Sequence, residues 1–227
     1  MKKFFLYIAL ILPGVMEAQT WNLPSITSPK FKKDTLNIVK AGARPDGFTL
    51  NTKAINSSIE TMSKKGGGVV LVPKGLWLTG PIVLQSNVNL HLANGSTLLF
   101  TKDKSQYLLI EANWEGLPQM RNQSPISATA ARNIAITGKG IVDGNGDVWR
   151  AVKKDKFTES QWKKKVESGG VLSDDKKTWY PSAGFMKGSK MPANPGMIMP
   201  GRDRAFYDSI KDFLRPNLLL LTQCKNI

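Results

Sequence analysis

The sequence has 227 residues, of which 41% are hydrophobic and 22% charged, and its formal net charge is +15 at pH 7. This length is enough for one sizeable globular domain, and the basic balance suits an anionic partner. The single cysteine, Cys224, excludes an intramolecular disulfide. Its strand-like surroundings indicate a buried core thiol rather than a nucleophile.

Residues 1–18 have the pattern of a secretory signal peptide. Two lysines precede an apolar stretch from Phe4 to Val15, and small and polar residues follow as far as Ala18. The apolar stretch is shorter than the roughly 20 residues that a spanning helix needs, which disfavours a membrane anchor. We therefore expect cleavage after Ala18, a secreted or periplasmic protein and no stable membrane insertion. Loss of two lysines and one glutamate would change the net charge from +15 to +14.

After an N-terminal extension, residues 19–36, the first regular element that the sequence predicts is an amphipathic helix. Asn51 is placed to cap its free N–H groups. Ile55, Ile59 and Met62 recur at i, i+4 and i+7, and basic residues followed by Gly66 end the stripe. A single helix before a run of strands is expected to cap that run, covering the apolar interior and the strand edges of its first coil.

From Gly66 to Phe100 the sequence consists of short aliphatic runs broken by Gly, Pro, Asn or Ser. Each run is strand-length and too short for a helix. Val88, Leu90 and Leu92 alternate with polar residues, the period-2 pattern of a strand with one buried face. Strands and tight turns without intervening helices favour an all-β fold, a parallel β-helix, over a hairpin sandwich.

A repeated tripeptide supports the β-helix. A polar residue, an asparagine and an aliphatic residue occur together at residues 86–88, 132–134 and 225–227. Asn87 and Asn133 are 46 positions apart, which we interpret as two turns of about 23 residues each.

The strand pattern is interrupted by a long segment near the end of the chain. It returns at residues 133–144, disappears from about 148 to 215, and resumes at Leu218. The interruption is rich in lysine, glycine, proline and aromatic residues, and loops of this length in a compact fold are usually functional insertions. The sequence stops at Ile227 in mid-pattern, so we expect residues 37–227 to be the N-terminal part of a β-helix domain, an incomplete solenoid.

An acidic polysaccharide is the anionic partner that best fits an exported basic protein. The sequence has no helix-turn-helix, zinc-finger or RNP pattern, so we expect no nucleic-acid partner. We also expect no cofactor and no metal site. The alternative for any one basic cluster, such as Lys163 to Lys165, is a solvated surface.

Five stretches in order resemble the amino-terminal part of glycoside hydrolase family 28, the polygalacturonases and their relatives. The resemblance runs from about Asn37 to Ile227. Other pectin-acting and tailspike β-helices share the opening stretch, so the ordered set of five carries the resemblance. The stretches are Gly42 to Ile55, Gly66 to Pro73, Leu78 to Leu92, Ile136 to Trp149 and Arg215 to Ile227.

The resemblance implies a right-handed parallel β-helix that hydrolyses α-linked galacturonic acid with inversion. Such chemistry uses one carboxylic acid on the leaving oxygen and one carboxylate that activates water. In the family these groups come from an Asn-Thr-Asp motif and an Asp-Asp pair, aided by Gly-His-Gly and Arg-Ile-Lys motifs. None of the four is matched here, and all normally follow the coil corresponding to Arg215–Ile227. We therefore assign no catalytic residue and expect this chain to be an inactive fragment of a pectin-degrading enzyme.

The remaining acidic residues and the only histidine are expected to be structural. Asp143 and Asp147 match turns between coils, and His91 lies on an alternating strand and matches a structural position. Asp174 and Asp175 lie in a lysine-rich loop and are expected to be solvated.

The long insertion is expected to form a wall of the substrate cleft. We predict that Trp179 or Tyr180 stacks on a sugar face and that Arg202 or Arg204 pairs with a uronate carboxylate. The alternative is that the aromatic residues only pin the insertion to the solenoid.

The function expected from the resemblance is that of a polygalacturonase-like glycosidase acting on pectin in the cell wall. Two rivals stay open: another β-helix enzyme of pectin, either a lyase or a rhamnogalacturonan-type enzyme, and a non-catalytic β-helix that binds acidic polysaccharide. The linkage and endo or exo action also stay open.

Overall fold

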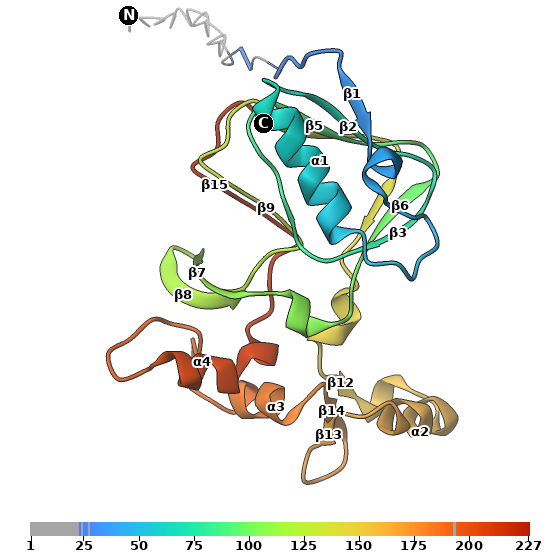
Figure 1. Ribbon diagram of the computed structural model, residues 1–227. Coiled ribbons are helices and arrows are strands. Elements are labelled where there is room, and N and C mark those ends of the chain that lie inside the picture. The colour runs from blue at the N-terminus through green and yellow to red at the C-terminus, as the bar shows by residue number, and fades with distance from the viewer. Residues whose placement is uncertain (1–22, 24, 27, 193) are drawn as a thin grey trace, which may run out of the picture.

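The computed structural model describes residues 23, 25–26, 28–192 and 194–227, and it has two lobes (Figure 1). The expected signal peptide, residues 1–18, lies outside the described residues. The upper lobe is a solenoid of parallel strands, and the lower lobe consists of a hairpin and the long insertion. Within the described residues, no helix is long and apolar enough to span a membrane.

The solenoid is made of three parallel sheets with strand orders β1-β2-β5-β10, β3-β6-β11 and β4-β9-β15. Three coils therefore follow one another along the chain: β2-β3-β4, then β5-β6-β9, then β10-β11-β15. This is a parallel β-helix, as the sequence predicted. The strand bounds are Thr35–Asn37 (β1), Gly68–Val72 (β2), Gly75–Thr79 (β3), Ile82–Val83 (β4), Val88–Leu92 (β5), Ser96–Phe100 (β6), Ile126–Thr129 (β9), Ala135–Gly138 (β10), Ile141–Asp143 (β11) and Leu219–Thr222 (β15).

The pairing register corrects the predicted length of a coil. Val69 pairs with Asn89, and Asn89 pairs with Ala135. The first step is 89 − 69 = 20 residues and the second is 135 − 89 = 46, so the 46 residues form one turn and not two. The second coil is longer because a hairpin is inserted between β6 and β9.

Alternation of side chains builds the core of the solenoid. Every second residue of β2, β5 and β6 is buried and the residues between them are half-buried, as expected for pleated strands that surround an apolar interior. The largest fully buried side chains of this core are Ile38, Ile55, Ile59, Trp77, Ile82, Leu90, Leu98, Phe100, Ile126 and Ile134.

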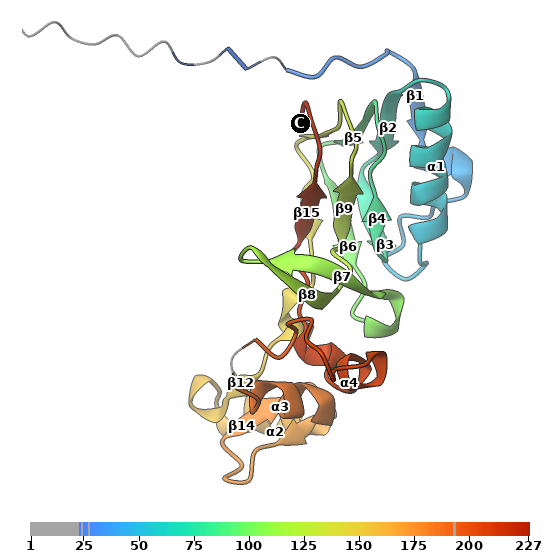
Figure 2. The same cartoon turned by 90° about the vertical axis from the view of Figure 1, so that its left-hand side faces the viewer.

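The predicted helix is present as α1, Thr52–Lys64. Its predicted stripe, Ile55, Ile59 and Met62, is buried, and α1 contacts β1, β2, β4 and β5. In Figure 2 the helix lies beside the first coil, at the end of the solenoid away from β15. That the helix caps an open end remains a prediction.

Asn51 occupies the N-cap position of α1, but its side chain makes no capping hydrogen bond. The side chain is buried and bonds the backbone of other segments instead. Its Oδ1 accepts from Arg44 N–H at 2.8 Å, and its Nδ2 donates to the carbonyls of Arg44, Thr49 and Leu78. The prediction that the Asn51 side chain caps the helix was therefore wrong. Buried backbone groups must be paired, and those of neighbouring segments use the side-chain amide in place of the N–H groups of the helix.

Both interruptions of the solenoid occur at the same corner, between the second and third sheets. The hairpin separates β6 from β9, and the insertion separates β11 from β15. Together, the hairpin and the insertion form the lower lobe. Its strands and helices are β7 (Leu109–Trp114), β8 (Leu117–Asn122), β12 (Val152–Lys153), β13 (Val171–Leu172), β14 (Thr178–Tyr180), α2 (Glu159–Glu167), α3 (Ala183–Ser189) and α4 (Arg204–Ser209). Short 3-10 helices are η1 (Ile38–Ala41), η2 (Lys104–Gln106), η3 (Gly146–Trp149), η4 (Lys154–Lys156) and η5 (Lys211–Phe213).

A second apolar cluster joins the hairpin to the insertion. Leu109 and Met120 of the hairpin pack with Tyr207, Ile210 and Leu214 of the insertion. Asn122, at the end of β8, donates its side-chain amide to the carbonyls of Lys211 and Leu214 at 2.7 and 2.9 Å. The hairpin thus couples the insertion to the solenoid, and Figure 1 shows it lying between them.

The third coil is more exposed than the first two. Ile141, Leu219 and Ile227 expose 60%, 44% and 60% of their surface. Cys224 packs against the core but is half-buried, its thiol donating to the Thr222 carbonyl. The expectation of a buried core thiol therefore holds in part: Cys224 packs against the core, but part of its surface is exposed.

Candidate functional site

The two predicted aromatic site residues lie on β14, in a small antiparallel sheet with β12 and β13. Trp179 is only 6% exposed, its indole N–H donates to the Gly169 carbonyl at 2.6 Å, and the Lys165 ammonium lies 3.7 Å from its ring centroid. Tyr180 is half-buried, 6.1 Å from Phe185 between ring centroids. The rings hold the insertion together, and the burial of Trp179 leaves little of its surface for a sugar.

Of the two predicted arginines, Arg204 begins α4 and Arg202 lies two residues before it. The Arg202 guanidinium donates to the carbonyls of Asn194, Pro195 and Met197 at 3.1 to 3.3 Å. Arg204 is exposed and its Nε lies 3.3 Å from an Asp208 carboxylate oxygen one helical turn later. Arg202 therefore stabilises the segment before α4, whereas Arg204 presents its charge to solvent. That these four residues bind substrate remains a prediction.

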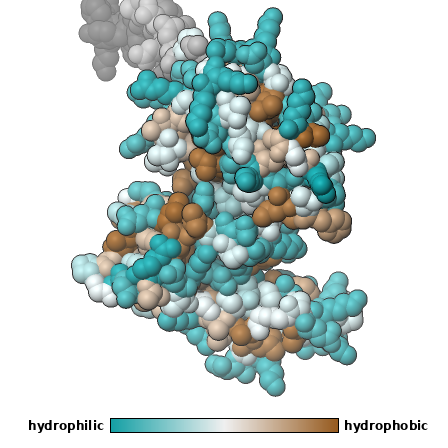
Figure 3. Space-filling model, viewed as in Figure 1, coloured by the Kyte–Doolittle hydropathy of each residue, from teal (hydrophilic) through white to brown (hydrophobic). Residues whose placement is uncertain are grey.

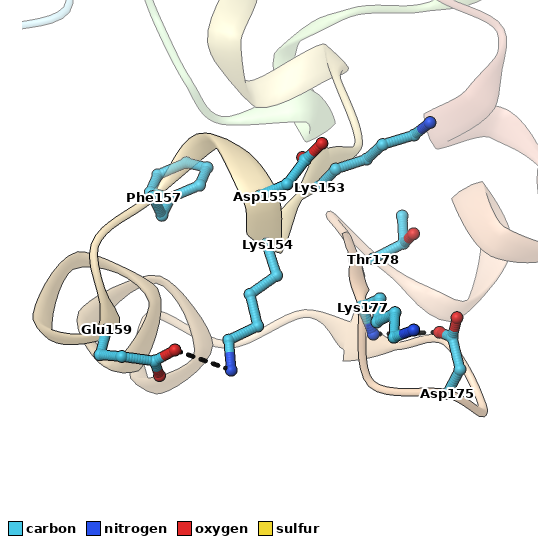
Figure 4. A pocket seen from close by; sticks show the side chains of 8 residues that line it. All are labelled: Lys153, Lys154, Asp155, Phe157, Glu159, Asp175, Lys177 and Thr178. Carbon is cyan, nitrogen blue, oxygen red and sulfur yellow. Dashed lines mark hydrogen bonds and ion pairs between the residues drawn. The ribbon is translucent and has the colours of Figure 1, made fainter.

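A hollow of about 570 Å³ lies on the insertion, between η4, the start of α2 and β14 (Figure 4). Lys154 forms an ion pair with Glu159 at 3.0 Å, and Asp175 accepts from the Lys177 N–H at 3.0 Å. The bond from the Ser173 hydroxyl, more than the Lys177 bond, lowers the pKa of Asp175. Three lysines and three carboxylates line the hollow together with Phe157 and Thr178, so it offers a polyanion no net attraction.

A second site lies where the lobes meet, and we call it the junction pocket. It consists of two hollows of about 360 and 370 Å³ that share Trp149 and Arg215. Figure 3 shows apolar patches among hydrophilic residues at this level of the molecule. The first hollow is lined by Trp114, Arg121, Trp149, Phe185, Asn194, Pro195, Gly196, Phe213, Leu214 and Arg215, and the second by Pro125, Gly144, Gly146, Trp149, Arg150, Arg215, Pro216, Asn217 and Leu218.

Trp149 is fixed at the centre of the junction pocket. It ends η3, is only 4% exposed, and meets Tyr107 edge-on with ring centroids 5.4 Å apart. Burial raises the pKa of Tyr107 to about 12, and its hydroxyl donates to the Thr101 carbonyl at 2.9 Å. Lys104 covers the same indole at 5.4 Å from its centroid. The indole thus has a defined orientation before any ligand arrives.

Arg121 is held on β8 by contacts that leave its charge unpaired. Its guanidinium stacks 3.8 Å from the Trp114 ring centroid, and it donates to the Arg215 carbonyl and to Gln119 Oε1. Its Nε is buried and has no hydrogen-bond partner in the described part of the chain. Burial, and next the charge of Arg215, lower the pKa of Arg121 to about 10.

The junction pocket is cationic. Arg121, Arg150 and Arg215 line it, and neither hollow has an acidic residue in its lining. Glu115, at the tip of the hairpin, acts on Arg121 only as a weak opposing charge. Planar guanidinium groups match a carboxylate with two parallel hydrogen bonds, and indole rings offer an apolar face with a polar edge. The pocket is therefore suited to a small acidic ligand with an apolar face.

The residues that we expected to be structural make structural contacts. His91 Nδ1 lies 2.8 Å from Thr137 Oγ1 on the neighbouring coil. Asp143 accepts the Asn145 N–H at 2.9 Å, and Asp147 pairs with Lys102 at 3.3 Å. Residues 23, 25–26, 28–192 and 194–227 contain no group of three metal-binding side chains.

Comparisons with known proteins identify the relatives of this chain. No protein-family model matches it. Over 152 residues it is 35% identical to an exo-poly-alpha-D-galacturonosidase of Dickeya chrysanthemi. This match covers 61% of our chain and 25% of the Dickeya protein. The fold of our chain is similar to the crystal structure of a hyperthermoactive exopolygalacturonase from Thermotoga maritima, with a TM-score of 0.59 and 28% sequence identity. The match covers 88% of this chain and 41% of the Thermotoga chain.

A second solved structure names the family. The family 28 exopolygalacturonase of Yersinia enterocolitica matches with a TM-score of 0.56 and 25% identity, covering 85% of this chain and 33% of that one. The resemblance to glycoside hydrolase family 28 is confirmed. The chain spans a quarter of the length of the curated Dickeya relative.

The junction pocket was only partly visible in the sequence. Trp149 and Arg215 belong to stretches that carry the family 28 resemblance, but Arg121 and Trp114 lie in a segment without clear periodicity. The missed signal was the hairpin turn at Glu115 and Gly116, both with positive φ. Such two-residue turns are recognised most easily as Asn-Gly or Asp-Gly, and Glu-Gly is a weaker signal.

Proposed function

We propose that the whole protein hydrolyses glycosidic bonds in pectic, galacturonic acid-containing polysaccharide. The observation that carries the proposal is the 35% identity to an exo-poly-alpha-D-galacturonosidase along a chain that folds as a parallel β-helix. We further propose an inverting mechanism, in which an acid protonates the leaving oxygen and a carboxylate activates water. The solenoid is taken to be right-handed because parallel crossover connections almost always are, and the protein is taken to be exported.

Within that function, the lobe built on the solenoid corner contributes to substrate binding. It adds aromatic rings and basic side chains beside the parallel sheets, and Arg204 presents an exposed cation. Asp143 and Asp147 are engaged in local contacts and are not assigned to catalysis. Because the family's four catalytic and carboxylate-binding motifs are not matched in these residues, we expect this chain to bind polygalacturonate without cleaving it.

The test measures binding and cleavage on the same preparation. The purified chain is titrated with polygalacturonate and, as a control, with neutral galactan, and new reducing ends are assayed in parallel. We expect binding to polygalacturonate only and no new reducing ends. Equal binding to both polymers, or to neither, contradicts the proposed binding of pectic polysaccharide by this chain. Products with an unsaturated uronate end would instead indicate a lyase.

A further inference from the structure

We propose that the junction pocket is a uronate-binding subsite, in which Arg121 and Arg215 bind the carboxylate of one acidic sugar unit and the buried Trp149 forms part of the pocket wall. This inference rests on the proposed function, because it names the substrate group that the site recognises. The ligand class is a hexuronate unit of a pectic chain. A neutral hexose lacks the carboxylate and is expected to bind poorly.

The charges of the pocket carry the first step. Arg121 and Arg215 line the same hollow, the Arg121 guanidinium donates to the Arg215 carbonyl, and no carboxylate lines either hollow. Cations gathered in a partly buried site without counter-charge repel each other, which destabilises the ligand-free protein. A bound carboxylate removes this repulsion, so the arrangement favours an anionic ligand.

The hydrogen bonds carry the second step. A guanidinium has five N–H donors in a fixed plane, and the contacts of Arg121 use its two terminal nitrogens. Its Nε is buried and unpartnered in the described residues, so a ligand does not reach it, and the second N–H group of each terminal nitrogen is the donor left for a carboxylate. Stacking on Trp114 fixes the plane of the group. Arg121 is thus oriented in advance, and Arg215 is exposed and can close on the other side of a ligand.

The shape of the pocket carries the third step. Hollows of about 360 and 370 Å³ that share Trp149 and Arg215 lie at the small end of the range for ligand pockets, roughly 300 to 1,000 Å³. Trp149, held by Tyr107, lines both. The shared residues place the arginine charge and the aromatic ring between two spaces, which suits one recognised sugar unit with a neighbouring unit on the chain.

The experiment measures dissociation constants by calorimetry for digalacturonate, for its neutral analogue galactobiose, and for inorganic phosphate. Variants are R121Q, R215Q and, as a matched control, R132Q, which removes an equal charge from an exposed position on the solenoid. We expect R121Q and R215Q each to weaken digalacturonate binding about tenfold or more, the usual effect of losing a charge-assisted hydrogen bond, and R132Q to change it less than about twofold.

Each outcome decides a different point. Wild-type protein that binds polygalacturonate while R215Q and R132Q behave alike overturns the subsite and leaves the proposed function intact. Wild-type protein that binds neither polymer nor dimer overturns the proposed binding of pectic polysaccharide by this chain, and the subsite with it. Phosphate that binds as tightly as digalacturonate shows a general anion site and overturns the uronate assignment. R215Q changes only an exposed side chain, so the test holds even where R121Q fails to fold.

Discussion

Asn133 donates a hydrogen bond from its side-chain amide to Asn87 Oδ1 at 3.0 Å, and Asn226 repeats the contact with Asn133 Oδ1 at the same distance. The three asparagines stack at one corner of three successive turns. All three have positive φ, between 52° and 66°. Asparagine tolerates this left-handed conformation better than other residues with a side chain. The ladder therefore stabilises the corner that sets the register between coils.

Replacement of Asn133 by alanine is expected to lower the free energy of unfolding by about 1 to 3 kcal/mol, because two ladder hydrogen bonds are lost and alanine resists positive φ. Asn133→Gly is the matched control, since it loses the same bonds but accepts φ. We expect the alanine variant to be less stable than the glycine variant by about 1 kcal/mol, as measured by urea denaturation. A glycine variant as stable as the wild type would show that the ladder contributes nothing.

A glycine on the next stretch of the same coil gives a second stability prediction. Gly138 has φ of 103°, and an added Cβ would lie 1.9 Å from the Leu92 carbonyl oxygen, which accepts the N–H groups of Lys139 and Gly140. Gly138→Ala is therefore expected to cost more than about 3 kcal/mol of unfolding free energy. Gly42→Ala, at φ of 89° with open space around it, should cost about 1 to 2 kcal/mol. Equal losses in thermal melting would contradict the clash.

The sequence predicted the architecture because its signals are local. The apolar alternation of β5 and the stripe of α1 are properties of neighbouring residues. The length of the second coil was missed because it depends on which strands pair, and the hairpin between β6 and β9 hid that 46 residues make a single turn. Asn51 was misjudged for the same reason: its partners Arg44 and Leu78 come from other segments.

The candidate site was predicted less well than the fold. Trp179 was chosen for its residue type, but its burial follows from the packing of the insertion's own sheet. The pairing of Arg121 with Arg215 joins residues 94 positions apart and depends on how the hairpin docks on the insertion. Composition identified the basic, aromatic character of the lobe, whereas the meeting point of these side chains required the tertiary structure.

The turn before α1 gives a prediction about pH. The Thr49 hydroxyl, together with the N–H groups of Thr49 and Phe48, donates to the Asp46 carboxylate and lowers its pKa to about 2. A carboxyl whose pKa is depressed on folding stabilises the fold above its unfolded value, near 3.8, and loses that contribution as pH falls toward 2. We expect carbon NMR titration of Asp46 to give a midpoint near 2 in the wild type and a higher midpoint in Thr49→Val. Identical midpoints would exclude the hydroxyl as the main cause.

The last prediction tests whether the insertion recognises polygalacturonate or only attracts it by charge. Arg204 and Lys163 form a matched pair: each is an exposed cation, 59% and 79% exposed, that pairs with a carboxylate one helical turn later, Asp208 or Glu167. Arg202 is less suitable, because its contacts with three carbonyls make its loss a change of structure.

We expect Arg204→Ala to weaken polygalacturonate binding more than Lys163→Ala does at the same ionic strength, because a guanidinium can bind a uronate carboxylate with two hydrogen bonds. Binding of both variants should fall as salt rises, since the screening length shrinks from about 10 Å at 0.1 M to about 3 Å at 1 M. The salt trend alone therefore does not separate the two explanations, and the comparison at fixed salt does. Equal weakening in affinity electrophoresis would leave only the non-specific attraction of a basic surface and would remove Arg204 from the proposed cleft.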